Sequence, residues 1–236
     1  EQARANRFQL DLSRVAPAPK QAGVHLWQNV DLNVLRDYID WTPFFLTWQL
    51  SGKYPAILNH AEVGIEARKL FKDANAMLDK MIGEGHVSGK AIFGLFPANS
   101  DGDDIVVYSD ESRSTEKARL FNLRQQLQLR NNAPNCCLAD FVAPVDSGVA
   151  DYIGAFAVST GFGADELAAE YAAAHDDYNS IMVKALADRL AEALAEYLHL
   201  KVRREYWGYA SDETLDNEQL IRELYQGIRP APGYPA

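Results

Sequence analysis

Cysteine is nearly absent from this sequence. Only Cys136 and Cys137 occur among 236 residues, and they are neighbours. Adjacent thiols cannot build a disulfide framework, and the chain has no third cysteine to complete a thiolate set around a metal ion. We therefore expect two reduced, buried thiols in a cytoplasmic protein, and we assign no metal site.

Long apolar runs and an excess of positive charge are also missing. No stretch approaches the roughly 20 apolar residues of a membrane span, and the first residues, Glu1–Arg4, lack the layout of a secretion signal. Lys and Arg number 23 against 33 Asp and Glu, so the net charge is −10. An acidic surface argues against nucleic acid or membrane as partners and suits a basic protein or a small ligand. The first residue is not Met, as expected of a piece of a longer protein.

The residues that are present predict a single α+β domain. Hydrophobic residues make up 47% of the chain, which is ample for one core. Helices are expected where apolar residues recur every three or four positions, over 30–38, 61–83, 114–131, 165–174, 177–202 and 216–225. Strands are expected over 91–97, 105–108, 136–141 and 150–158. Because these strands do not alternate strictly with helices, we predict an antiparallel, meander-like sheet flanked by helices. Residues 1–24 would form an extended N-terminal arm and residues 25–236 the domain.

A lone acid lies in the most aromatic stretch of the chain, Tyr38–Trp48. Asp40 must be paired, hydrogen-bonded or solvent-exposed, because burying an isolated charge among aromatic rings is costly. One reading is structural, in which Asp40 caps a helix that opens at Thr42 and Pro43. The other reading is a role in binding, and the surrounding residues do not decide between the two.

Three acids follow one another at four-residue spacing on the helix predicted over 177–202. Asp188, Glu192 and Glu196 share one face with Lys184, and the apolar stripe lies on another. Like charges at this spacing repel each other weakly. Either water surrounds this face, or a basic group lies against it.

The last residues combine a cation with stiff, irregular backbone. The segment Arg229-Pro-Ala-Pro-Gly-Tyr234 can be neither helix nor central strand, because half of its residues are Pro or Gly. Arginine offers a planar fork of donors that suits a carboxylate, and neighbouring backbone groups can meet a flat heterocycle. The segment therefore suits a small anionic or zwitterionic ligand. Taken alone, it is also typical of a surface turn before a loose terminus.

Seven runs of sequence, taken in order, carry a resemblance to a known family. They are Tyr38–Phe45, Leu70–Asn75, Gly94–Asn99, Cys137–Val142, Asp151–Ala157, His175–Asn179 and Arg229–Tyr234. Together they resemble the S-adenosylmethionine-binding activation domain of cobalamin-dependent methionine synthase. The likeness covers nearly the whole chain after the arm, and the ordered set is specific although no single run is.

The resemblance implies a module of a methyltransferase of methionine biosynthesis. In this family the whole enzyme moves a methyl group from methyltetrahydrofolate to homocysteine through cobalamin. The activation domain binds S-adenosylmethionine and presents its methyl group for reductive methylation of cob(II)alamin, while flavodoxin or a flavoprotein reductase supplies the electron. Cobalamin would be bound by a partner module and not by this chain. The alternative is a non-catalytic interaction module that docks a cobalamin protein or flavodoxin through its acidic surface.

The resemblance also implies the residues that bind the ligand. Arg229, Gly233 and Tyr234 match the family's Arg-x-x-x-Gly-Tyr motif, and Asp40 matches its acidic contact. Arg229 would hold the methionyl carboxylate and Asp40 the ammonium group. Tyr234 would contact the adenosine part.

Further residues follow from the same resemblance. The backbone of Ala231 would meet the adenosine part, and Glu223 is a weaker candidate beside the sulfonium. We assign no catalytic residue, since the nucleophile belongs to the cofactor. Asp188 and its acidic neighbours would face Lys53 or the cobalamin module. The family continues beyond the Gly-Tyr motif, so we expect the last part of the domain to be missing from this chain.

Overall fold

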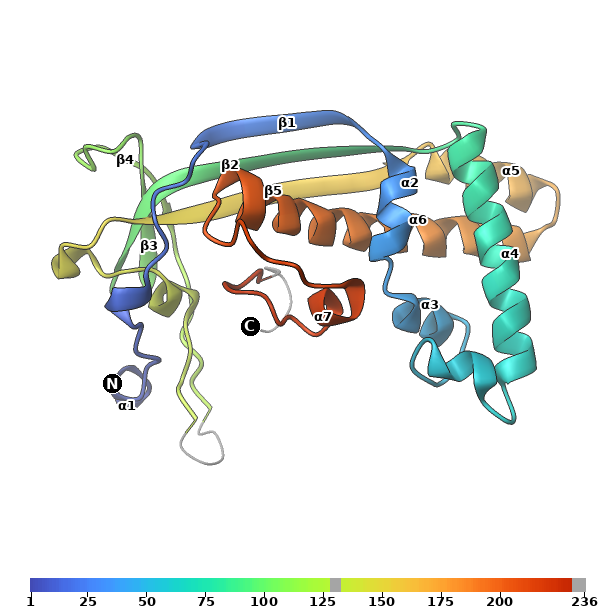
Figure 1. The fold of residues 1–236 in the computed structure, drawn as a ribbon, viewed down its shortest axis with the longest axis horizontal. Helices are drawn as coiled ribbons and strands as arrows, with labels where there is room; N and C mark the ends of the chain where they lie inside the picture. Colours follow the sequence, from blue (N-terminus) through green and yellow to red (C-terminus); the bar gives the residue numbers. More distant parts are fainter. Residues whose placement is uncertain (128–132, 231–236) are drawn as a thin grey trace.

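A long, curved antiparallel sheet runs through the molecule (Figure 1). In this computed structural model, residues 1–127 and 133–230 are described. The central strand, β2, pairs with β5 along nearly its whole length, with β1 along its first half and with β3 near its end. β4 extends the sheet beyond β3. The strands are β1 Gly23–Val30, β2 Ser88–Asp101, β3 Asp104–Tyr108, β4 Glu116–Leu120 and β5 Asp151–Phe162.

One long helix, α6, follows a face of the sheet, and most other helices gather near its N-terminal end (Figure 1). This arrangement confirms the predicted α+β class with an antiparallel sheet. Among residues 1–127 and 133–230, no helix is both long and apolar enough to cross a membrane. The helices are α1 Gln2–Ala5, α2 Leu32–Leu35, α3 Trp41–Thr47, α4 Gly64–Gly83, α5 Ala164–Ala173, α6 Asp177–Lys201 and α7 Asn217–Ile221.

The apolar stripe of α6 forms the centre of the core. Val183, Leu186, Leu190 and Leu194 are fully buried, as their helical spacing predicts. Phe93 of β2 belongs to the same hydrophobic cluster. Each such side chain contributes about 1.5–3 kcal/mol by leaving water. The stripe therefore fixes how α6 is rotated against the sheet.

The helix predicted over 114–131 is wrong. Within it, β4 pairs with β3, and the chain after β4 has no helix up to residue 127. Arg124 holds this segment in place, because its buried guanidinium donates hydrogen bonds to the carboxylates of Asp103 and Asp140 and to the carbonyl of Asn135. Strand pairing and this buried ion pair outweigh a modest helix propensity.

The strand predicted over 136–141 is also wrong. Leu138–Phe141 form a 3-10 turn, which Asp140 stabilises by accepting a hydrogen bond from the backbone N–H of Cys137 at 3.0 Å. The strand that pairs with β5 is β2. Cys137 is buried, as expected, whereas Cys136 is half-buried.

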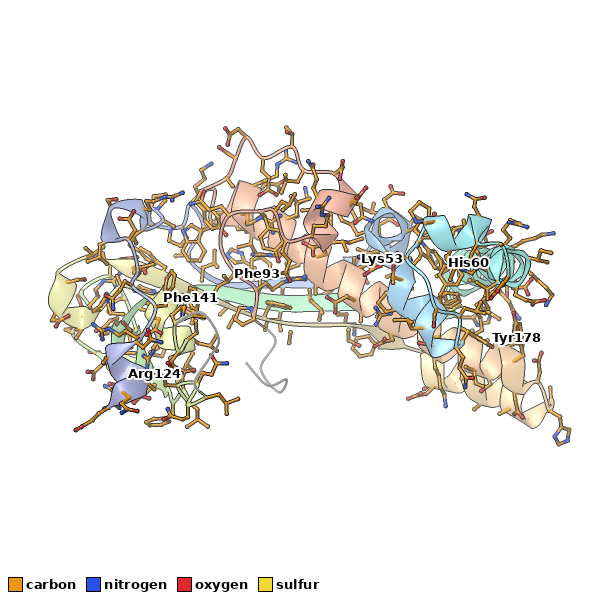
Figure 2. All side chains as sticks on the ribbon, turned by 90° about the horizontal axis from the view of Figure 1, so that it is seen from below. Lys53, His60, Phe93, Arg124, Phe141 and Tyr178 are labelled. Carbon is orange, nitrogen blue, oxygen red and sulfur yellow. The ribbon has the colours of Figure 1, made fainter. Side chains whose placement is uncertain are left out.

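The N-terminal region differs from the prediction in detail. β1 lies where the arm and the first helix were expected to meet, and the helix itself shortens to α2 and a 3-10 turn at Arg36–Tyr38. The arm carries α1 and docks on the far end of the sheet, where Phe8 stacks on Phe141 with ring centroids 4.9 Å apart. Figure 2 shows Phe141 and Arg124 at one end of the molecule and His60 and Tyr178 toward the other.

Replacing Arg124 by Ala should destabilise the fold by about 3–5 kcal/mol, because two carboxylates would lose their buried partner. The side chain of Asp140 is only 4% exposed, so water cannot replace the guanidinium there. The measurement is the free energy of unfolding in urea. Arg119→Ala serves as the control, since Arg119 pairs with the exposed Asp101 and Glu116 and should cost at most about 1 kcal/mol. Equal losses in the two variants would contradict this account.

Candidate functional site

A cavity of about 210 Å³ lies against α6. Figure 1 shows α7, which contributes to its wall, on the side of α6 that faces away from the sheet. The walls of the cavity come from the turn before α3, from α6, and from α7 with the segment that follows it. It therefore brings Asp40 and Arg229 together from opposite ends of the sequence. The lining residues are Tyr38, Asp40, Pro43, Arg189, Glu192, Glu196, Leu220, Ile221, Glu223 and Arg229.

Arg229 is the best-anchored cation of this cavity. Its Nη2 donates a hydrogen bond to Oε2 of Glu196 at 2.8 Å and lies 3.7 Å from Oε1 of Glu192. The side chains of Arg229 and Glu196 are 13% and 8% exposed. Within the part of the chain that the structure describes, Nη1 of Arg229 and Oε1 of Glu196 are buried and have no hydrogen-bond partner. The pair therefore leaves one donor and one acceptor for a further group.

The acidic face of α6 has a basic group against it, as one of the two readings predicted. That group is Arg229, which contacts Glu192 and Glu196. Asp188 instead pairs with its neighbour Arg189. Lys53 forms no ion pair within the described ranges, so the structure does not bring it to Asp188.

The structure confirms that Asp40 caps a helix and also places it at the cavity. Its Oδ1 accepts a hydrogen bond from the backbone N–H of Thr42 at 2.9 Å, which makes Asp40 the N-cap of α3. The same side chain lines the cavity. Because the capping hydrogen bond holds one carboxylate oxygen of Asp40, the other oxygen points in a fixed direction, which suits a ligand contact.

Glu223 reaches the cavity from a strained turn. Its φ is +55°, in the left-handed region that costs a residue with a side chain about 1–2 kcal/mol. The turn follows α7, which is capped by Asp216. This helix ends at Ile221, whereas the prediction placed its end at residue 225. Strain of this kind gathers at binding sites because the surroundings must hold it in place.

Three of the predicted site residues lie outside the described part of the chain. Ala231, Gly233 and Tyr234 follow Arg229 and Pro230 directly, and their roles stay predictions. Of the six predicted residues, the structure brings together Asp40, Glu223 and Arg229.

A second layer of charged and aromatic groups lies near Arg229, and no sequence signal marks it. Arg203 is fully buried, donates two hydrogen bonds to Glu213 and lies 4.2 Å from the ring centroid of Tyr225. His199 meets the same ring edge-on, with centroids 4.8 Å apart. These contacts tie the segment after α7 to the C-terminal end of α6.

Burial controls the charges in this layer. It lowers the pKa of His199 to about 3, and the nearby Arg203 and Arg229 act in the same direction. His199 is therefore neutral near pH 7. Burial raises the pKa of Glu196, and Arg229 opposes the rise. The charge of Arg203 opposes the rise in the pKa of Glu196 as well.

A larger hollow, of about 370 Å³, lies between α4 and the start of α6. Its polar groups already bind one another or their neighbours. Tyr178 donates to Asp73 at 2.9 Å, and Lys80 donates to Tyr171 at 2.8 Å. With these groups satisfied, this hollow is the weaker candidate.

Residues 31–236 match the sequence model of a family described as "Vitamin B12 dependent methionine synthase, activation domain". The chain belongs to this family. Its fold is similar to that of a solved structure, "Crystal Structure of the MetH Reactivation Domain bound to AdoHcy", with 57% sequence identity and a TM-score of 0.94. The match covers 99% of this chain and 72% of that chain. The resemblance predicted from the seven sequence runs is confirmed.

The neutral His199 makes the stability of this activation domain depend on pH. Its pKa in the fold, about 3, lies below its ordinary value of 6.5, so between these values the unfolded chain binds a proton that the fold excludes. Stability should therefore fall with decreasing pH, by about 1 kcal/mol per pH unit from this residue. Urea unfolding between pH 7 and pH 4 measures the slope. His199→Phe should make it shallower by that amount.

The matched control for this prediction is His175→Asn, because His175 is exposed. This variant should unfold with the wild-type slope. If His199→Phe also keeps the wild-type slope, the buried histidine is not the cause of the pH dependence.

Proposed function

We propose that this activation domain binds S-adenosylmethionine and presents its methyl group for the reductive methylation of cob(II)alamin, as part of a cytoplasmic cobalamin-dependent methionine synthase. The observation that carries the proposal is the buried guanidinium of Arg229 in the cavity, with Nη1 unpartnered among the described residues. A guanidinium of this kind suits a carboxylate. Further support comes from the similar domain that was solved with AdoHcy.

The residues of the cavity fit the amino-acid end of such a ligand. The ligand carboxylate accepts a hydrogen bond from Nη1 of Arg229, and the ammonium group donates one to the carboxylate of Asp40. Glu223 lies beside the sulfonium, whose positive charge suits a cavity that also contains Glu192 and Glu196. A volume of about 210 Å³ suits this end rather than the whole ligand.

The adenosine end of the ligand would lie against residues after Pro230. We assign its contacts to the backbone of Ala231, to the close approach that Gly233 permits, and to Tyr234. These three assignments rest on the family motif.

The residues of this chain act by binding and orienting the ligand. Methyl transfer from a sulfonium needs no general base, so no side chain has to move a proton. Correct positioning of two reactants alone is worth several kcal/mol. When bound by its partner module, cobalamin supplies the nucleophile, and flavodoxin or a flavoprotein reductase supplies the electron.

Replacing Arg229 by Ala should weaken the binding of S-adenosylmethionine about 10- to 100-fold, which corresponds to the loss of a charge-assisted hydrogen bond. Isothermal titration calorimetry measures the affinity, and thermal unfolding checks that the fold is kept. The control is Arg222→Ala, because Arg222 is exposed, lies on the same segment and pairs only weakly with Glu218, at 3.7 Å. It should bind like wild type. If the folded wild-type chain binds no S-adenosylmethionine, the interaction-module alternative is favoured instead.

A further inference from the structure

We propose that Glu196 is the positioning residue that orients Arg229 toward the carboxylate of the ligand. The proposal rests on the proposed function and adds a residue that neither the sequence motif nor the resemblance assigns. Glu196 would act through Arg229, without itself contacting the ligand carboxylate.

The two partners differ in how firmly their backbones are held. Glu196 lies in the C-terminal third of α6, next to the buried Ala195, so its position is set by the core. Arg229 lies in an irregular segment, just after Gly227 with its φ of +94°. A long side chain on such a segment has many rotamers to lose, unless a fixed group anchors it. The 2.8 Å hydrogen bond to Glu196 is that anchor.

Among the described residues, Arg229 is the cation that forms an ion pair with Glu196. Arg203 is already neutralised by Glu213, through bonds of 3.0 and 2.6 Å. His199 is neutral because it is buried. Glu192 and Glu223 are acids themselves. Loss of Arg229 would therefore leave the buried carboxylate of Glu196 without its hydrogen-bonded partner.

The contact with Glu196 occupies only one of the two terminal nitrogens of the guanidinium. One nitrogen, Nη2, binds Glu196, whereas Nη1 is buried without a partner among the residues described. A guanidinium has donors on both of these nitrogens in one rigid plane. Fixing Nη2 therefore fixes the direction in which Nη1 points. Without the carboxylate of Glu196, the same guanidinium would be free to turn away.

The test compares two ligands, AdoHcy and its decarboxylated analogue, which keeps the ammonium group and lacks the carboxylate. In Glu196→Gln, the affinity for AdoHcy should fall at least about 10-fold, since the fixed donor is lost. The affinity for the analogue should change less than about 2-fold. Calorimetry measures both, with weak binding read by competition. A loss of purely structural origin would weaken both ligands alike, and that result would overturn the proposal.

Two further variants complete the experiment. Glu205→Gln is the matched control, because Glu205 is an exposed acid that pairs with Lys201, and it should bind both ligands like wild type. The double variant Glu196→Gln/Arg229→Gln removes both charges together, so it avoids an unpaired buried cation. If Glu196 acts through Arg229, the double variant should bind AdoHcy as Arg229→Gln alone does. An additional loss in the double variant would also overturn the proposal. Absence of AdoHcy binding to the wild type would instead reject the proposed function.

Discussion

The packing of α6 against the sheet is the constraint on which both the core and the candidate site depend. The buried stripe from Val183 to Leu194 sets the rotation of the helix about its axis. This rotation also decides where the remaining faces of the helix point. Glu192 and Glu196 are one turn apart on such a face and form an acidic wall of the cavity. The positions of these two carboxylates are thus set by apolar residues that do not line the cavity.

Local periodicity accounts for the parts of the fold that could be predicted. α4, α6 and the hairpin of β2 and β3 each follow from one repeating pattern in the sequence. β4 and the turn at Leu138–Phe141 could not be predicted in this way, because their conformations depend on Arg124 and on partners far away in the sequence. In the site, Asp40 and Arg229 were predicted from a family motif. Tyr38 and Leu220 line the same cavity, and nothing in their local sequence indicates it.

Arg229 is paired with Glu196, yet its Nη1 has no hydrogen-bond partner among the described residues. Arg203 has a dedicated partner in Glu213, and burial keeps His199 neutral. Arg229 pairs with Glu196 at 2.8 Å and lies farther from Glu192, at 3.7 Å. A buried network that satisfied every group would leave nothing for a ligand to bind. The acids exceed the bases in the cavity, which favours a ligand that carries positive charge.

The cavity is closed by residues that are far apart in the chain, and this has a consequence for folding. Asp40 and Glu223 line the same cavity although they are 183 residues apart, and closing so large a loop costs entropy that other parts of the fold must offset. The segment after α7 is held by a few contacts, among them Tyr225 on Arg203 and Arg229 on Glu196. Such a segment opens locally at lower free energy than the core. A bound ligand would therefore slow amide hydrogen exchange in this segment first, well before it changed the exchange of α6.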